Sequence, residues 1–361
     1  MANPEKSALV LAGGGITGFL YEVAVLAAFE EAASGGFGAG DFDIYMGTSA
    51  GAVLAALLAN GASIREVYGA LDADDGESLF NFRQSDVFGL GARGPLSLII
   101  QFLKPVPGIV RRSIRGRRWP SFAEVLADFQ AHHPPGFYST DPLQETLCSR
   151  FTTLGFRHHF NELRRELYVT GTDIDRGERL VFGSGELRDF HICQAVSASC
   201  AIPIFFRPIR IGERDVVDGG VSGAPLDVCV ERGARQILFV NPLVPLQNDR
   251  SRVCLPLDEG HCARIAEKGV GWIGDQAMRL LFSVEVSAVR KALAAKHPEV
   301  RLSVVSPARD EVPMFMTNVM SFSARREILA YGRESASRYF AGSGRPLLEH
   351  LMAGAAIRRE L

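Results

Sequence analysis

The sequence predicts an α/β fold, a three-layer α/β/α sandwich with a mainly parallel central sheet. Two short apolar segments, residues 8–12 and 42–46, are each followed by a glycine-containing turn and then by an apolar helical segment. Continuous apolar runs of this length are typical of strands buried on both faces, and the alternation of strand and helix favours parallel pairing. The helix expected over residues 52–59 has no polar face, so it should lie in the centre of the molecule.

The rest of the chain continues this pattern after a looser section. Residues 60–165 carry recurrent glycines and prolines without a clean strand, which indicates an inserted helical or loop-rich cap. Beyond the cap, the sequence predicts a hairpin over 166–182, a helix over 190–199, and short strands over 209–211, 215–217, 236–240 and 301–305. The helix between the last two strands carries an apolar stripe that predicts core packing: Met278, Leu281, Phe282, Val286, Val289 and Leu293.

Composition and charge exclude several classes of protein. Of the 361 residues, 47% are apolar and 22% are charged, which is ordinary globular usage and excludes disordered, collagenous and coiled-coil chains. The 39 basic and 41 acidic side chains leave a net charge of −2, which argues against attraction of the whole molecule to nucleic acid. The length suits about two domains, or one large α/β domain with an insertion.

The cysteines, the histidines and the N-terminus bear on compartment and metal binding. The six cysteines are thinly spread, which predicts free buried thiols in a reducing compartment. Neither they nor the eight histidines show a metal-binding spacing, so no metal site is expected, and the paired histidines at 132–133 and 158–159 are interpreted as solvated loop residues. No signal peptide is apparent, and no window reaches the roughly 18 apolar residues of a spanning helix. We therefore expect a cytoplasmic protein or one at the membrane surface.

The first motif with chemical meaning is the turn Gly13-x-Gly15-x-x-Gly18 between an expected strand and an expected helix. This context suits a dinucleotide fingerprint, but that motif requires an acidic residue at the end of the next strand, whereas here the strand starts at Asp43 and ends at Met46. A purely structural turn is a second alternative. The turn offers a row of backbone N–H groups at a helix N-terminus, which favours an oxyanion-binding loop.

The second motif, Gly47-x-Ser49-x-Gly51, has the form of a nucleophile elbow. Its glycines permit a sharp strand-to-helix turn that presents the serine hydroxyl at the N-terminus of a buried helix, where the dipole favours a developing alkoxide. A serine helix cap is the simpler alternative. A Ser-His-Asp triad is discounted, because the elbow comes too early for an α/β-hydrolase sheet and no later histidine lies in a recognisable loop signature.

The third motif, Asp218-Gly219-Gly220, puts a carboxylate at the end of an expected strand. Because the two glycines carry no side chain, another backbone segment or a substrate can approach the carboxylate closely. Taken alone, a turn aspartate is the default interpretation. In a chain that also carries a serine elbow, the carboxylate is a candidate base for that serine.

Together these motifs resemble the patatin-like phospholipase family. The glycine turn is similar to the family's oxyanion loop, and Gly-Thr-Ser-Ala-Gly is similar to its nucleophile elbow. Asp-Gly-Gly is similar to the family's acid box. Residues 195–208 are similar to the Ala-Ser-x-Ala-x-Pro-x-x-Phe block that precedes this box. The resemblance implies a catalytic domain over residues 1–230, with the cap at about 60–165, and a C-terminal part of the same fold with peripheral helices over 231–361. Ala12 and Thr17 depart from the family pattern, which has Asp and Arg or Lys there.

The resemblance implies a Ser-Asp dyad that works without histidine, metal or cofactor. Ser49 would be the nucleophile and Asp218 the general base. Backbone N–H groups of Gly13, Gly14 and Gly15 would form the oxyanion hole. The motif glycines that shape these turns are Gly18, Gly47, Gly51, Gly219 and Gly220.

A basic segment predicts a lipid interface. Between residues 93 and 118 the chain has seven basic residues and no acidic residue, and they flank an apolar run at 96–103. An apolar wedge with a basic rim is how an interfacial segment binds an anionic bilayer, and Arg111, Arg112 and Arg115 are the candidate contact residues. The alternative is a cap whose apolar run packs on the core while its arginines are solvated.

The function predicted from these features is lipid acyl hydrolysis of the phospholipase A or lysophospholipase type. The partner would be a phospholipid or another fatty-acyl ester, with peripheral membrane association and without nucleic acid. The same dyad would also serve an acyltransferase or a thioesterase. A nucleotide- or lipid-binding module that keeps the loop without turnover is the non-enzymatic alternative.

Overall fold

The computed structural model describes residues 5–87, 89, 105–116, 121, 123–124, 135–251, 254–255, 262–315, 320 and 322–360. Among these residues, an eight-stranded sheet has the order β10-β9-β1-β2-β4-β8-β7, with β5 also paired to β4. The strands from β10 to β4 are parallel, and β5, β7 and β8 join them in antiparallel pairs. The strands are β1 (Lys6–Leu11), β2 (Ile44–Gly47), β4 (Glu166–Asp173), β5 (Glu178–Phe182), β7 (Ile209–Ile211), β8 (Arg214–Asp218), β9 (Ala234–Val240) and β10 (Arg301–Val305).

The sheet separates two apolar cores, which confirms the predicted three-layer sandwich. In β1, Leu9 and Leu11 contribute to the larger core and Ala8 and Val10 to the smaller one, because successive side chains of a strand point to opposite faces. The helices on the larger core are α1 (Gly15–Ala32), α2 (Ala50–Ala59), α3 (Ile64–Asp72), α8 (Asp141–Leu154), α9 (Ile192–Ser199), α12 (Arg325–Ala341) and α13 (Arg345–Glu360). The smaller core is covered by α10 (Leu226–Glu231) and α11 (Val270–Lys296).

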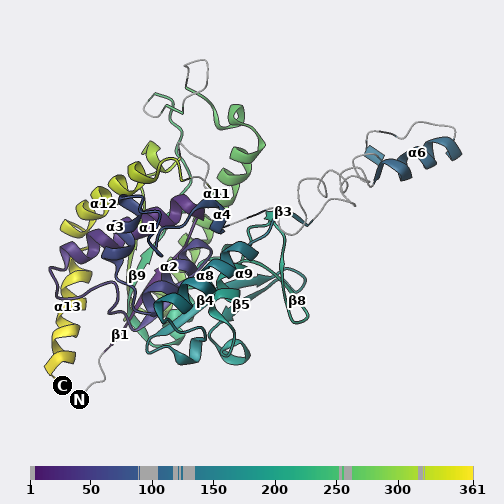
Figure 1. Cartoon of the computed structure of the whole chain (residues 1–361). Helices are drawn as coiled ribbons and strands as arrows, with labels where there is room; N and C mark the ends of the chain where they lie inside the picture. The colour runs from purple at the N-terminus through teal and green to yellow at the C-terminus, as the bar shows by residue number, and fades with distance from the viewer. Residues whose placement is uncertain are drawn as a thin grey trace.

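The segment predicted as a cap is not uniform. α3 and α8 bury their apolar faces in the larger core, whereas α6 (Pro105–Gly116) lies apart from the sheet (Figure 1). The segment also holds a strand, contrary to expectation: β3 (Gly136–Tyr138) pairs with β6 (Ile204–Phe206), and a strand this short leaves no periodic signature. The remaining elements are α4 (Gln84–Val87), η1 (Phe160–Glu162), η2 (Gly185–Leu187), η3 (Gly219–Ser222), η4 (Ile265–Lys268) and η5 (Val312–Met314).

The apolar stripe of α11 is only partly buried. Phe282 and Val286 lie in the smaller core as predicted, but Met278 and Leu281 have 53% and 67% of their surface exposed. The prediction of core packing is therefore wrong for these two residues, because helical periodicity shows which residues share a face and not how far a neighbouring element extends along it. Within the described ranges, neither α11 nor any other helix is long and apolar enough to cross a membrane.

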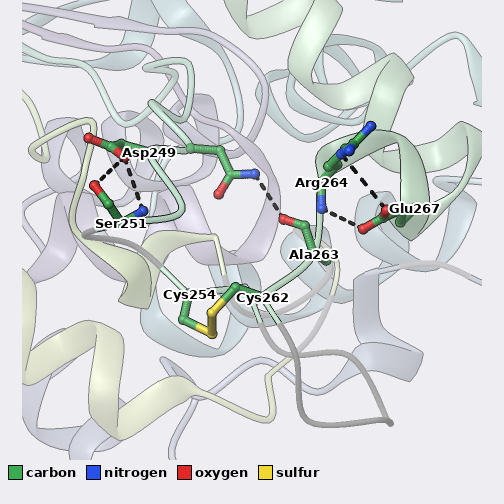
Figure 2. The surroundings of a disulfide bond; sticks show 8 residues. Asp249, Ser251, Cys254, Cys262, Ala263, Arg264 and Glu267 are labelled. Carbon is green, nitrogen blue, oxygen red and sulfur yellow. Dashed lines mark hydrogen bonds and ion pairs between the residues drawn. A yellow bond between two sulfur atoms is a disulfide. The ribbon is translucent and has the colours of Figure 1, made fainter.

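The cysteines also depart from the prediction of free buried thiols. Cys254 and Cys262, eight positions apart, form a disulfide beside Ala263 (Figure 2). Cys193 is free and buried, as predicted, whereas Cys148 and Cys200 are free but partly exposed. The prediction fails for the disulfide pair because bond formation depends on how closely two Cβ atoms approach in the folded chain, which sequence spacing does not show.

Candidate active site

The ends of β2 and β8 meet along one edge of β4. β2 pairs with β4 as far as Gly47 opposite Val169, and β8 pairs with it as far as Asp218 opposite Gly171. β5 occupies one edge of β4 there, because it pairs with both Val169 and Gly171. β2 and β8 therefore share the other edge. Because β2 is parallel and β8 antiparallel to β4, their C-terminal ends point toward each other, about 7 Å apart along β4. The sheet thus brings the turn after Gly47 to the carboxylate of Asp218.

Ser49 occupies a strained position in the turn between β2 and α2. Its φ of 54° and ψ of −132° lie in a region that costs a residue with a side chain about 1–3 kcal/mol. Glycines are needed on both sides: a Cβ on Gly51 would lie 2.6 Å from the Leu11 carbonyl oxygen, and one on Gly47 would overlap the backbone of Ala52. The Ser49 side chain makes no capping hydrogen bond to α2, so the turn presents its hydroxyl instead.

Neighbouring segments fix the backbones of the serine and the acid. The Ser49 N–H donates to Ser199 Oγ, at the end of α9, over 2.8 Å. The Asp218 N–H donates to the Ala201 carbonyl oxygen over 2.9 Å, and Thr172 Oγ1 donates to the Asp218 carbonyl oxygen over 3.0 Å. Ser199 and Thr172 were not identified from the sequence as site residues, because nothing local distinguishes them from other small polar residues.

The Asp218 carboxyl is buried but keeps one oxygen available. Oδ1 accepts the Gly220 N–H at 2.8 Å, whereas Oδ2 has no hydrogen-bond partner among the described residues. Burial raises the pKa of Asp218 to about 6, while the Ser49 hydroxyl and the Gly220 N–H both lower it. Ser49 therefore lies close enough to stabilise the carboxylate without closing a full hydrogen bond to Oδ2, and contacts of this kind tighten when substrate binds.

The glycine turn supplies fewer free amides than the sequence suggests. Gly13, Gly14 and Gly15 all have positive φ, and α1 begins at Gly15. The Gly13 N–H is already engaged, because it donates to Glu22 Oε1 over 2.7 Å. Gly14 and Gly15 remain as donors, and Gly15 borders the same cavity as Ser49. The first N–H groups of a helix have no partner within the helix, which suits them to an oxyanion.

Glu22 is the acid that the sequence analysis missed at this turn. Its side chain is completely buried within α1, and burial raises its pKa well above the ordinary value. Burial therefore disfavours the charged form of this carboxyl, and its Oε1 accepts the Gly13 N–H. The available signal was Glu22 itself, the only charged residue between positions 15 and 29 of this helix, since a buried acid requires a specific partner.

The other motif glycines serve close packing and backbone hydrogen bonding. A Cβ on Gly18 would overlap the carbonyl group at the start of the glycine turn, and one on Gly219 would overlap Thr170. Gly220 supplies the N–H that binds the Asp218 carboxyl. These positions therefore support the turns and contribute no side-chain chemistry.

A mostly apolar cavity opens at Ser49. Its lining includes Phe19, Phe82, Leu143 and Phe206, from four separate elements or loops. No histidine and no charged side chain is among the described residues that line it. Its lining therefore favours an aliphatic group over a charged one beside the serine.

The predicted interface residues lie away from this cavity. Arg111 and Arg115 are exposed on α6, which Figure 1 shows apart from the sheet. Arg112 belongs to the same helix, but its side chain and the apolar run at 96–103 lie outside the described residues. The structure thus brings Ser49, Asp218 and the glycine turn together and leaves α6 separate (Figure 1).

Comparison with known proteins identifies the family. Residues 9–230 match the model of the family described as patatin-like phospholipase. The chain is 27% identical over 254 residues to the uncharacterized protein YqhO of Bacillus subtilis (strain 168), over 67% of this chain and 73% of that protein.

Two solved structures are also similar to the chain. VipD from Legionella pneumophila has a TM-score of 0.37 and 13% identity over 96% of this chain and 67% of its own. The type III effector protein ExoU has a TM-score of 0.33 and 17% identity over 98% of this chain and 54% of its own. The family assignment rests on the match over residues 9–230, which spans more than half of the sequence. By that match, the chain belongs to the patatin-like phospholipase family.

Proposed function

We propose that the protein hydrolyses fatty-acyl esters of phospholipids, as a phospholipase A or lysophospholipase, through an acyl-Ser49 intermediate. The observation that carries this proposal is the buried pair of Ser49 and Asp218: the serine lines the apolar cavity, and its hydroxyl lies close to a carboxyl whose Oδ2 is available. Ser49 and Asp218 are each only 6% exposed, so charge developing between them is weakly screened by water. Membership in a family of lipid acyl hydrolases supports the ester substrate.

The geometry supports a two-step acyl transfer. Ser49 Oγ attacks the ester carbonyl carbon as its proton passes to Asp218 Oδ2, and the N–H groups of Gly14 and Gly15 bind the resulting oxyanion. The tetrahedral intermediate expels the alcohol, which takes the proton from Asp218 and leaves acyl-Ser49. Water then attacks the acyl carbonyl, Asp218 accepts its proton, and breakdown of the second intermediate returns that proton to Ser49 and releases the fatty acid.

The substrate side of the proposal includes the membrane surface. The apolar cavity would hold the acyl chain, and α6 would contact an anionic bilayer through Arg111 and Arg115. On this helix, Val110 and Ile114, each next to an arginine in the sequence, are 49% and 73% exposed, so apolar and basic groups are available together. Arg112 is assigned to the same contact from its position in the sequence.

Covalent labelling tests the nucleophile directly. A fluorophosphonate probe should modify the wild-type protein and not Ser49→Ala, whereas Ser337→Ala, which changes an exposed serine on α12, should label normally. Mass spectrometry of vesicles incubated with the wild type should show free fatty acid and lysophospholipid, and with Ser49→Ala neither. A folded wild-type protein that fails to label would contradict the enzyme and favour a binding module.

Product analysis separates hydrolysis from the related transfer reactions. Adding small alcohols during turnover gives acyl-Ser49 a second acceptor besides water. Free fatty acid as the main product supports the hydrolase, and a predominant new ester would assign an acyltransferase. Faster turnover of acyl thioesters than of matched oxygen esters would assign a thioesterase.

A further inference from the structure

Four side chains of the kinds that bind zinc lie together near the start of α9. One ligand atom from each lies within 4.8 Å of the corresponding atom of every other. One of the cysteines is buried and the other three residues are partly buried. This Cys/His cluster consists of Cys148 in α8, His158 after α8, His191 directly before α9 and Cys193 in α9.

The arrangement is close to that of a closed tetrahedral metal site. Bonds of about 2.0–2.3 Å to zinc place tetrahedral ligand atoms about 3.3–3.8 Å apart. Cys148 Sγ and His191 Nδ1 already lie 3.8 Å apart. Two thiolates, two neutral imidazoles and one Zn²⁺ carry no net charge, so the loaded site is suited to partial burial. Soft sulfur and imidazole nitrogen in this ratio form a donor set typical of structural zinc.

Hydrogen bonds outside the cluster orient its ligands. Thr152 Oγ1 donates its proton to the Cys148 carbonyl oxygen over 2.9 Å, so it accepts from His158 Nε2, which lies 3.3 Å away. This bond places the proton of His158 on Nε2 and leaves the Nδ1 lone pair for a metal. The backbone is tied as well, since the Ile192 N–H donates to the His158 carbonyl oxygen over 2.8 Å.

We propose that the Cys/His cluster binds one structural zinc ion that joins α8 to α9. Four protein ligands leave no open coordination position for water, so the ion would stabilise the fold and take no part in catalysis. α9 is about 12 Å long and ends at Ser199, which holds the backbone of Ser49. α8 begins beside Thr140, which lines the cavity. Zinc at the remote end of α9 would therefore fix two elements that border the proposed active site.

Metal analysis of the full chain tests the site without reference to activity. Protein expressed with zinc in the medium and purified without a metal-affinity tag should contain about one zinc per chain. Protein stripped of zinc should bind Co²⁺ and develop the thiolate-to-cobalt charge-transfer and d–d absorption of a tetrahedral thiolate site. Restoring zinc should raise the melting temperature of the stripped protein.

Variants with matched controls assign the ligands. Cys193→Ser and His158→Gln should each lose most of the bound zinc, and restoring zinc should no longer raise their melting temperature. His159→Gln alters the neighbouring histidine, whose ring centroid lies 4.9 Å from that of His191 but which is outside the cluster, and it should keep both. Cys229→Ala, which changes another buried free cysteine, should also keep both.

Two results would overturn the proposal. One is a folded wild-type protein with less than about a tenth of a zinc per chain that also fails to give cobalt–thiolate absorption. The other is a Cys148–Cys193 disulfide in the native protein, found by mass spectrometry, because a disulfide removes both thiolates. If Cys193→Ser fails to fold, the wild-type cobalt spectrum decides the matter, since its charge-transfer bands require thiolate ligands.

Discussion

The glycine turn before α1 and the serine turn before α2 each face a buried acid, but burial disfavours the charge of Glu22 more strongly than that of Asp218. At the glycine turn, Glu22 Oε1 accepts one backbone N–H, and burial raises the pKa of Glu22 well above its ordinary value. At the serine turn, burial raises the pKa of Asp218 only to about 6, because Ser49 and Gly220 both stabilise the ionised form.

The difference in pKa between the two carboxyl groups bears on what each of them can do chemically. A neutral acid can accept a hydrogen bond and hold a backbone amide, but it cannot take a proton from serine. An acid with a pKa just below neutrality is mostly ionised at pH 7 and still binds a proton strongly enough to act as a base. Both acids are buried and both accept the N–H of a glycine, so the Ser49 hydroxyl beside Asp218 is what distinguishes the two sites in the proposed mechanism.

Removing the charge of Asp218 should have the largest effect. Asp218→Asn keeps the shape and abolishes the base, so kcat/KM on a lipid ester should fall about 10⁴-fold. The melting temperature should rise, because a pKa raised from 3.8 to about 6 destabilises the ionised folded protein at neutral pH by up to about 3 kcal/mol. Asp72→Asn, on the exposed surface of α3, is the control and should change neither quantity. Retained activity would contradict the assignment of Asp218 as base.

Two substitutions of Glu22 test the other half of the comparison. Glu22→Gln keeps a neutral acceptor for the Gly13 N–H, so kcat/KM on a soluble ester and the melting temperature should stay close to wild type. Glu22→Ala leaves that N–H unsatisfied, which should cost about 1–3 kcal/mol of stability and about 10²-fold in kcat/KM through displacement of the oxyanion donors. Equal damage by both substitutions would mean that the charge of Glu22 matters and that the carboxyl is ionised.

The sequence predicts those parts of the site in which the reactive residue and the backbone turn that presents it lie within a few consecutive positions. Ser49 and Asp218 each lie at a strand end next to glycines, and those glycines are needed where other backbone segments approach closely. Parallel pairing of the early strands follows from apolar segments that alternate with helices. Each of these features can therefore be derived from a few consecutive residues.

The parts that sequence reasoning missed depend on contacts between distant segments. Ser199 acquires its role by meeting the N–H of Ser49, which is 150 positions away. The Cys/His cluster combines ligands from two segments, and His158, interpreted from the sequence as solvated, is partly buried within it. Helical periodicity similarly could not show that Met278 and Leu281 of the α11 stripe are left exposed by the elements that the structure describes.

A change on α6 tests whether either turn depends on the basic segment. The double substitution Arg111→Glu with Arg115→Glu should weaken binding to anionic vesicles at least about 30-fold, since each basic residue near such a surface contributes about 1 kcal/mol. Hydrolysis of a soluble ester should not change, because α6 lies apart from both turns. Arg290→Glu with Lys291→Glu, at the end of α11, matches the charge change and should bind normally. Unchanged binding of the α6 variant would reject the interface.

The dependence on pH distinguishes the two acids in the unmodified protein. With a soluble ester, kcat/KM should be half-maximal near pH 6 and about tenfold lower at pH 5, because the base form of Asp218 is lost as its carboxyl is protonated. Glu22→Gln should keep this profile, which assigns the step to Asp218. A profile that is flat down to pH 5 would contradict the raised pKa of Asp218.

Stability should respond to pH in the opposite direction. Since the folded protein holds the Asp218 proton more tightly than the unfolded chain does, the contribution of this group to stability is complete below about pH 4 and is lost as the pH rises through about 6. Asp218→Asn cannot ionise, so its advantage in melting temperature over the wild type should be absent near pH 4 and grow toward pH 7. If the difference in melting temperature between Asp218→Asn and the wild type is constant with pH, the stabilisation comes from packing. Ionisation of Asp218 would then not destabilise the folded protein.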